Sequence, residues 1–202
     1  MTDGSNSPEI NAPTRIAEKP LTRRALKKAH EQKLQEVSST SNIDLLTQLP
    51  NRRRFEERLR EESDRILRFG GRTTVVMLDA DNLKVINDKQ GHPAGDKYLK
   101  SIAEAIKRGI RRDIDFAARY GGDEFVLILP ETDAEGADTM WNNSLNPEFI
   151  KDGIAISAGA MELIPGNIEE TMRIADRAMY GAKHEPTRNG ENLMFYYMKK
   201  AS

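Results

Sequence analysis

The chain has 202 residues, of which 38% are hydrophobic and 31% are charged, with a formal net charge of −1 and no cysteine. This length suits one domain with an additional segment, and the near-neutral charge provides no bulk attraction to nucleic acid or to a membrane surface. The absence of cysteine excludes disulfides, thiolate zinc sites and cysteine nucleophiles. Because no stretch reaches the ~20 apolar residues of a membrane span, the composition predicts a cytoplasmic protein.

The N-terminal part of the chain is polar and lacks a sustained hydrophobic period. Residues 1–20 are rich in Ser, Asn, Pro and charge, which predicts a disordered tail. Residues 21–42 are expected to form a helical arm or linker, and the thin apolar stripe of this arm is compatible with a short coiled coil or with a solvated helix. The basic run over 19–33 either docks an acidic regulatory protein or is a solvated face.

The domain proper is expected to occupy residues 43–202. A leading loop over 43–50 precedes a helix for which Asn51 is the predicted N-cap. The apolar run over 73–78 is typical of a strand buried on both faces, and it ends in Asp79-Ala80-Asp81. Burying an unpaired carboxylate is costly, so acids at the end of a buried strand indicate a site.

The remaining segments alternate between helix and strand patterns. The expected elements are, in order, a short helix, a glycine turn and a second helix within 82–110, a β-hairpin over 115–130, a helix capped by Thr132 or Asp133, a strand over 153–161, a helix beginning at Asn167 and a strand over 193–198. This order predicts a single α/β domain with a central, mostly antiparallel sheet flanked by helices.

The hairpin over 115–130 has an unusual turn. It contains Gly121 and Gly122, which take positive φ at little cost, followed at once by Asp123 and Glu124. Adjacent strand residues point to opposite faces, so only one of the two carboxylates points squarely into a given cleft. Paired acids beside a flexible turn indicate a metal or a charged ligand.

Six motifs, taken together, give residues 44–197 a resemblance to the GGDEF domain of diguanylate cyclases. The motifs are Asp44-x-Leu46-Thr47-x-Leu49-Pro50-Asn51-Arg52, Asp79-x-Asp81, Lys84-x-x-Asn87-Asp88, Gly91-His92-x-x-Gly95-Asp96, Arg119-Tyr120-Gly121-Gly122-Asp123-Glu124-Phe125 and Ala175-Asp176-x-Ala178-x-Tyr180-x-Ala182-Lys183. The resemblance implies a nucleotide-cyclase-like domain of the palm, ferredoxin-like type. It also implies that two GTP molecules, each held by one subunit of a homodimer, condense into cyclic di-GMP and pyrophosphate.

The resemblance assigns roles to the acidic residues. Asp79, the carbonyl of Ala80 and Asp123 are expected to hold Mg²⁺ or Mn²⁺, with two ions per active site, against the triphosphate. Asp123 or Glu124 is expected to accept the 3′ proton, directly or through the metal. The sequence leaves these two roles open.

The resemblance also identifies substrate contacts. Asn87 and Asp96 are expected to read guanine, the carboxylate accepting from the ring N1 and the exocyclic amine. The further expected contacts are Leu83 beside the base, Gly121 and Gly122 leaving room for phosphates, and Lys84, Lys183 and Arg188 on the phosphates. Leu83 replaces a common phenylalanine, and the Lys183–Arg188 spacing is one residue wider than usual. The alternatives are cap or turn roles for Asn87 and Asp96 and a surface position for Lys183.

A second site is expected just before the hairpin. Arg112-x-x-Asp115 matches the inhibitory RxxD site of the family, at which the product cyclic di-GMP binds, and an arginine can contact a guanine edge or a phosphate in bidentate fashion. The alternative is a surface ion pair.

Three functions are compatible with these motifs. They are an active diguanylate cyclase, a receptor that binds GTP or cyclic di-GMP without turnover, and an adenylate- or polymerase-like enzyme of the same palm chemistry. The intact acids favour the first, and the guanine-reading pair disfavours the third. No sensory module is recognisable before residue 44. Control is therefore expected through the arm, a partner, the product site or a missing part of a longer chain.

Overall fold

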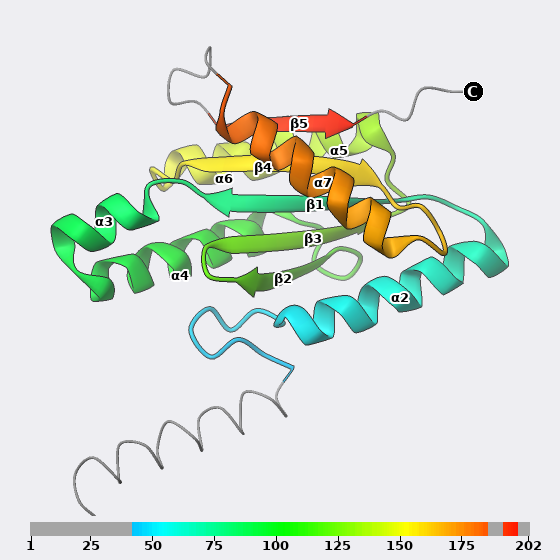
Figure 1. Cartoon of the computed structure of the whole chain (residues 1–202), viewed down its shortest axis with the longest axis horizontal. Helices are drawn as coiled ribbons and strands as arrows, with labels where there is room; N and C mark the ends of the chain where they lie inside the picture. The colour runs from blue at the N-terminus through cyan, green and yellow to red at the C-terminus, as the bar shows by residue number, and fades with distance from the viewer. Residues whose placement is uncertain (1–41, 186–191, 198–202) are drawn as a thin grey trace, which may run out of the picture. The chain divides into compact units, whose positions relative to one another are not determined.

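The computed structural model describes residues 42–185 and 192–197. The predicted tail over 1–20 and the arm over 21–41 lie outside these residues. Five strands form one sheet in the order β2-β3-β1-β4-β5 (Figure 1). They are β1 (Thr73–Ala80), β2 (Phe116–Gly121), β3 (Glu124–Pro130), β4 (Ile156–Glu162) and β5 (Leu193–Tyr197). All neighbouring pairs are antiparallel except β4 and β5, which confirms the mostly antiparallel sheet.

Helices cover both faces of this sheet (Figure 1). They are α2 (Arg52–Phe69), α3 (Leu83–Gln90), α4 (His92–Gly109), α5 (Ala134–Met140), the π-helical turn η1 (Trp141–Leu145), α6 (Asn146–Lys151) and α7 (Ile168–Lys183). Side chains from α2 and α7 pack on one face, and side chains from α4 and the continuous α5-η1-α6 segment pack on the other. In the described part of the chain, no helix combines the length and apolarity needed to cross a bilayer.

The strand β1 is buried along its whole length, as its apolar run predicts. Val75 and Met77 belong to the core under α2 and α7, whereas Val76 and Leu78 belong to the core under α4. This alternation follows from the two-residue period of a strand. Covering both faces explains why the run is continuous rather than alternating.

Side-chain caps fix the starts of three helices. Asn51 accepts from the backbone N–H of Arg54 at 3.2 Å, and Asn167 accepts from that of Glu170 at 3.2 Å. Of the two predicted caps before α5, Asp133 is the one that acts, because it accepts from the backbone N–H of Gly136 at 3.0 Å. The cap predictions at Asn51 and Asn167 are confirmed.

The prediction of a strand from residue 153 is wrong at its start. The helical segment runs to Lys151, and β4 begins only at Ile156. Between them, Gly153 has a φ of 66°, and the backbone N–H of Ile154 donates to the carbonyl of Phe149 at 2.8 Å. A left-handed glycine therefore terminates the helix where the apolar pattern alone suggests a strand.

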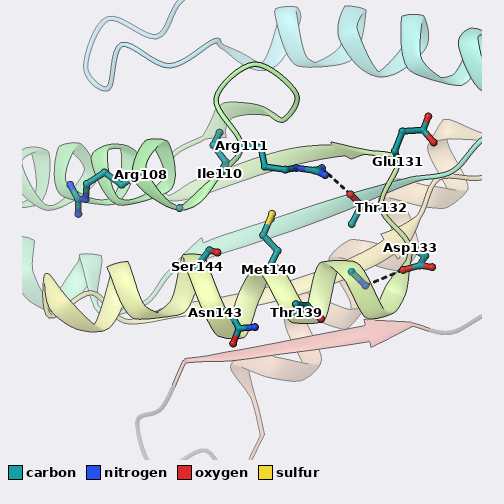
Figure 2. A pocket seen from close by; sticks show the side chains of 12 residues that line it. Arg108, Ile110, Arg111, Glu131, Thr132, Asp133, Thr139, Met140, Asn143 and Ser144 are labelled. Carbon is teal, nitrogen blue, oxygen red and sulfur yellow. Dashed lines mark hydrogen bonds between the residues drawn. The ribbon is translucent and has the colours of Figure 1, made fainter.

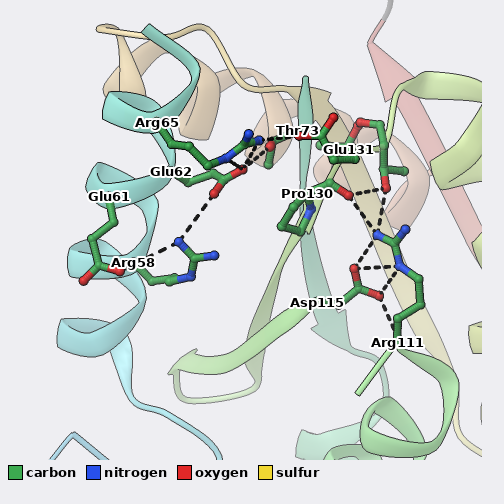
Figure 3. Close-up of polar contacts among 11 residues, drawn as sticks. Arg58, Glu61, Glu62, Arg65, Thr73, Arg111, Asp115, Pro130 and Glu131 are labelled. Atoms are coloured by element: carbon green, nitrogen blue, oxygen red, sulfur yellow. Dashed lines mark hydrogen bonds and ion pairs between the residues drawn. The ribbon is translucent and has the colours of Figure 1, made fainter. Parts of the chain in front are cut away.

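An ion cluster that the sequence did not indicate joins α2 to the sheet (Figure 3). Glu62 is fully buried, with Arg65 Nη2 at 2.9 Å and the hydroxyl of Thr73 donating to it at 2.5 Å. Burial opposes ionisation of Glu62, but hydrogen bonds from Arg65 and Thr73 outweigh burial and lower its pKa. Arg65 also contacts Glu131 at 2.8 Å, so α2 is tied to the far end of β3.

Gly159 provides a test of how closely β4 packs against α7. A Cβ at this position would lie 2.1 Å from the backbone nitrogen of Met179 and 2.2 Å from the carbonyl oxygen of Ala175. Because these are backbone atoms, Gly159→Ala is expected to lower the free energy of unfolding by about 2–3 kcal/mol in urea denaturation. Gly121→Ala is the control, since its Cβ would meet no atom within 4 Å. Equal unfolding midpoints for the two variants would contradict the packing.

Candidate active site

The pairing of β1 with its neighbours brings the predicted acids together. Asp79 lies opposite Glu124 on β3 and opposite Ser157 on β4. Cross-strand partners share a face, so Asp79 and Glu124 both face the α2 and α7 side of the sheet. Asp123 occupies the hairpin turn, and its carbonyl accepts from the backbone N–H of Ala80 at 3.0 Å. The exit of β1 and the hairpin turn are thus joined directly.

Lys183, at the end of α7, completes this group. Its Nζ lies 2.5 Å from Asp79 Oδ1, and the two side chains are 38% and 11% exposed, respectively. Burial raises the pKa of Asp79, and the nearby Asp123 and Asp81 raise it further against the opposing effect of Lys183. Asp79 is therefore a buried carboxylate with a cation already at its oxygen.

Glu124 experiences the same crowding of negative charge. Its pKa is raised by burial first, and then by Asp79, Asp123 and Asp176, while Arg52 opposes the shift. Like charges in a partly buried site destabilise one another's ionised form. A bound cation would relieve this repulsion.

The donor set fits a hard divalent cation. Its protein ligands would be carboxylate oxygens of Asp79 and Asp123 and the carbonyl oxygen of Ala80. The Lys183 ammonium already places one positive charge beside Asp79. Among the described residues, no group of three or more His, Asp or Glu side chains is arranged to enclose a metal ion. Mg²⁺ is usually held by one or two carboxylates together with substrate phosphates and water, and Asp79 and Asp123 are the two carboxylates expected here.

The turn that leaves β1 is held by contacts from β4 and α4. Ser157 Oγ donates to both carboxylate oxygens of Asp81 at 3.0 Å. The hydroxyl of Tyr98 accepts from the backbone N–H of Ala155 at 3.0 Å and lies 3.1 Å from the carbonyl of Asp81. Asp81 therefore shapes the turn, and Tyr98 is a supporting residue that sequence reasoning missed.

The predicted guanine-reading residues lie on α3 and α4. Within the described part of the chain, Asn87 Oδ1 is a buried acceptor without a hydrogen-bond partner. A Cβ at position 95 would lie 2.1 Å from this oxygen, so Gly95 provides the space that Asn87 occupies. Asp96 follows on α4 and is exposed, and Leu83 is half-buried against the core. An unsatisfied buried acceptor is costly, and base recognition by Asn87 and Asp96 stays a prediction.

The glycine turn is open on its outer side. No atom lies within 4 Å of a Cβ built on Gly121 or Gly122, and Gly122 has a φ of 49°. Arg119 holds the turn from behind, donating to the Gly122 carbonyl through Nη2 at 2.6 Å and pairing with Asp44 at 3.2 Å. The leading loop therefore braces the hairpin, a contact that the sequence did not indicate.

The predicted phosphate contacts are only partly brought together. Lys183 contacts Asp79, and Lys84 is exposed on α3. Arg188 lies outside the described residues. The roles of these three side chains remain predictions.

The predicted inhibitory site has an unexpected pairing. Asp115 is buried and bound by Arg111 rather than Arg112, with Arg111 Nη2 2.5 Å from Asp115 Oδ1 (Figure 3). Arg111 also donates to the carbonyl of Pro130 at 3.0 Å and to the hydroxyl of Thr132 at 2.9 Å. Arg112 is exposed. Product binding by Arg112 and Asp115 stays a prediction.

A cavity of about 520 Å³ lies beside Arg111, between the end of α4 and the α5-η1 segment (Figure 2). Its lining includes Arg108, Thr132 and Met140. It adjoins the C-terminal end of β3, whereas Glu124 lies at the N-terminal end. A strand of this length separates its ends by about 20 Å, so the cavity is distinct from the acidic cluster.

Comparisons with known proteins agree on one family. Residues 41–189 match the family described as "Diguanylate cyclase, GGDEF domain". The diguanylate cyclase DgcP of Pseudomonas aeruginosa is 39% identical over an alignment of 166 residues that covers 77% of this chain. This chain spans only 24% of the length of that relative.

Solved structures give the same result. The diguanylate cyclase SiaD of Pseudomonas aeruginosa, solved with its activator SiaC, is 32% identical with a TM-score of 0.69, and the match covers 85% of this chain and 69% of that one. The coiled coil and GGDEF domain of DgcB from Caulobacter crescentus, solved with c-di-GMP, is 28% identical with a TM-score of 0.68. That match covers 86% of this chain and 95% of the other.

The charge crowding at Glu124 predicts a stability change with a definite pH dependence. Because the folded-state pKa is raised above the ordinary value of 4.5, the ionised form destabilises the fold once the pH rises through the folded-state pKa. Glu124→Gln is expected to raise the free energy of unfolding at neutral pH by about 0.5–1 kcal/mol, a range reduced for partial exposure. The gain should vanish as the pH falls below 4.5.

Urea denaturation at both pH values measures this difference. Glu162→Gln is the matched control, because Glu162 is exposed at the end of β4. A Glu124→Gln protein that is less stable than the parent at neutral pH would contradict mutual repulsion among the acids.

Proposed function

The chain belongs to the GGDEF domain family of diguanylate cyclases, and we therefore propose that it condenses two GTP molecules into cyclic di-GMP with release of pyrophosphate. The observation that carries the proposal is the pairing of Asp79 with Glu124 beside Asp123, at the exit of a buried strand. This acidic cluster is what a metal-bound triphosphate requires.

The protein oxygens for the metal are Asp79, Asp123 and the carbonyl of Ala80. When bound, Mg²⁺ or Mn²⁺, two ions per active site, neutralises charge on the triphosphate and favours ionisation of the 3′-hydroxyl. Glu124 lies opposite Asp79 in the β1–β3 register and so belongs to the same acidic cluster. We assign acceptance of the proton from the 3′-hydroxyl to Glu124, and metal binding to Asp123.

Guanine selection rests on the residues beyond the turn. Asn87 offers its unpaired buried oxygen to the base, and the exposed carboxylate of Asp96 accepts from N1 and the exocyclic amine. Adenine lacks this donor pattern, so it leaves both acceptors unsatisfied. Leu83 packs beside the base in this proposal, and Lys84, Lys183 and Arg188 are the proposed phosphate contacts.

Catalysis in this scheme needs two chains. Each chain holds one GTP at its own acidic cluster, and a second copy brings the other GTP, so the active species is a homodimer. A regulatory protein acting through the arm over 21–42 is a further part of the proposal, supported by the similarity to SiaD, which was solved with its activator.

The direct test is to incubate the full chain with GTP and Mg²⁺ and to quantify cyclic di-GMP and pyrophosphate. Asp79→Asn is expected to lower the rate by at least about 100-fold, because it removes one of the metal carboxylates. Asp64→Asn, a change of the same chemistry at an exposed position of α2, should keep the parental rate. GTP binding without product, at concentrations where the protein is dimeric, would instead indicate a receptor.

We also propose that product binds at Arg112-x-x-Asp115. The cavity beside Arg111 provides space next to this motif, and the bond from Arg111 to Asp115 fixes the loop that carries Arg112. Arg112 is exposed and can contact a guanine edge or a phosphate in bidentate fashion. The DgcB structure, solved with c-di-GMP, supports a nucleotide-binding role for domains of this kind.

Arg112→Ala tests the inhibitory site. The concentration of cyclic di-GMP that halves the rate is expected to rise at least about tenfold, because a charge-assisted bidentate contact is lost. The initial rate, measured before product accumulates, should stay close to that of the parent. Arg68→Ala, at an exposed position of α2, is the matched control. Identical inhibition curves for parent and Arg112→Ala would refute the site.

A further inference from the structure

We propose that Lys183 is a placeholder for the metal. In the nucleotide-free protein, its ammonium lies against the Asp79 carboxylate at the position of the divalent cation. The cation binds only together with a nucleoside triphosphate, whose phosphates draw Lys183 away from Asp79. The inference deepens the proposed function, on which it rests for the identity of the ligand. It concerns the order in which metal and nucleotide bind.

The contact itself is the first observation. Lys183 Nζ lies 2.5 Å from Oδ1 of Asp79, a carboxylate that the proposed function assigns to the metal. Asp79 is 11% exposed and fixed at the end of β1 between two paired strands. A cation bound by this oxygen must therefore displace the ammonium.

Lys183 is the partner that can move. It is the last residue of α7, and its side chain is 38% exposed, so the ammonium can leave Asp79 without disturbing the core. A lysine ammonium is a compact charge on a flexible stem, and phosphate oxygens are suitable acceptors for it. The triphosphate thus offers Lys183 a new partner at the moment when the metal needs Asp79.

The sparseness of the metal site is the second observation. No group of three or more His, Asp or Glu side chains encloses a metal position anywhere in residues 42–185 and 192–197. Mg²⁺ bound by so few protein oxygens depends on phosphate oxygens for its remaining ligands. Free metal therefore competes poorly with an ammonium that is already in place.

Two other roles for Lys183 give different expectations. If the lysine only contacts phosphate, its removal leaves metal binding to the nucleotide-free protein unchanged. If it only neutralises Asp79 for stability, its removal lowers the unfolding midpoint and loosens the site, which weakens metal binding. The placeholder role alone predicts tighter metal binding when the ammonium is removed.

The experiment titrates the full chain with Mn²⁺ in the absence of nucleotide and measures free Mn²⁺ by electron paramagnetic resonance. Lys183→Met is expected to bind Mn²⁺ about three- to tenfold more tightly than the parent, the range for removal of one partly exposed competing charge. Lys183→Arg keeps the cation and should bind like the parent. Lys89→Met removes an exposed lysine from α3 and controls for net charge.

The proposal is overturned if Lys183→Met binds Mn²⁺ no more tightly than the parent does. Absence of binding in both proteins counts as this result. Lys183→Gln repeats the measurement with a polar side chain if the methionine variant does not fold. The result is independent of turnover, because no nucleotide is present. A parent that makes no cyclic di-GMP refutes the proposed function, whereas unchanged Mn²⁺ affinity refutes only the placeholder.

Discussion

The antiparallel register between β1 and β3 is the constraint on which the candidate site depends. It sets Asp79 opposite Glu124, and it brings the amide of Ala80 to the carbonyl of Asp123. A slip by one residue would move the acids to opposite faces and would also exchange the two apolar sets of β1. Because each set is buried under different helices, the core fixes the register, and the register fixes the site.

This arrangement concentrates negative charge where the protein must also remain folded. Burial first, and then Asp123 and Asp81, keep the pKa of Asp79 raised despite its contact with Lys183, and burial with Asp79, Asp123 and Asp176 raises the pKa of Glu124. Neighbouring residues outside the acidic cluster hold the two turns that carry it. Ser157 donates a hydrogen bond to Asp81, and Arg119 donates to the Gly122 carbonyl in the glycine turn. These bonds fix the backbone that carries the acids.

Local patterns in the sequence predicted the elements well, and long-range pairings could not be read from it. The apolar run of β1, the glycine hairpin and the Asn51 and Asn167 caps are local signals, and the structure confirms them. The contacts of the buried Glu62 and of the Tyr98 hydroxyl depend on partners far away in the chain. The pairing of Asp115 with Arg111 depends on a choice between two adjacent arginines. The predicted strand start at residue 153 is wrong because Gly153, with a left-handed backbone conformation, ends a helix inside an apolar stretch.

The leading loop is bonded to the hairpin turn at the candidate site. Asn42 accepts from the guanidinium of Arg53 at 2.7 Å, and its carbonyl accepts from the backbone N–H of Asn51 at 2.9 Å. Two residues later, Asp44 binds Arg119, which holds the Gly122 carbonyl. Polar contacts at residues 42–44 therefore join this loop to α2 and to the hairpin turn. The position of the hairpin turn, and with it that of Asp123, therefore depends on this loop as well as on the β1–β3 register.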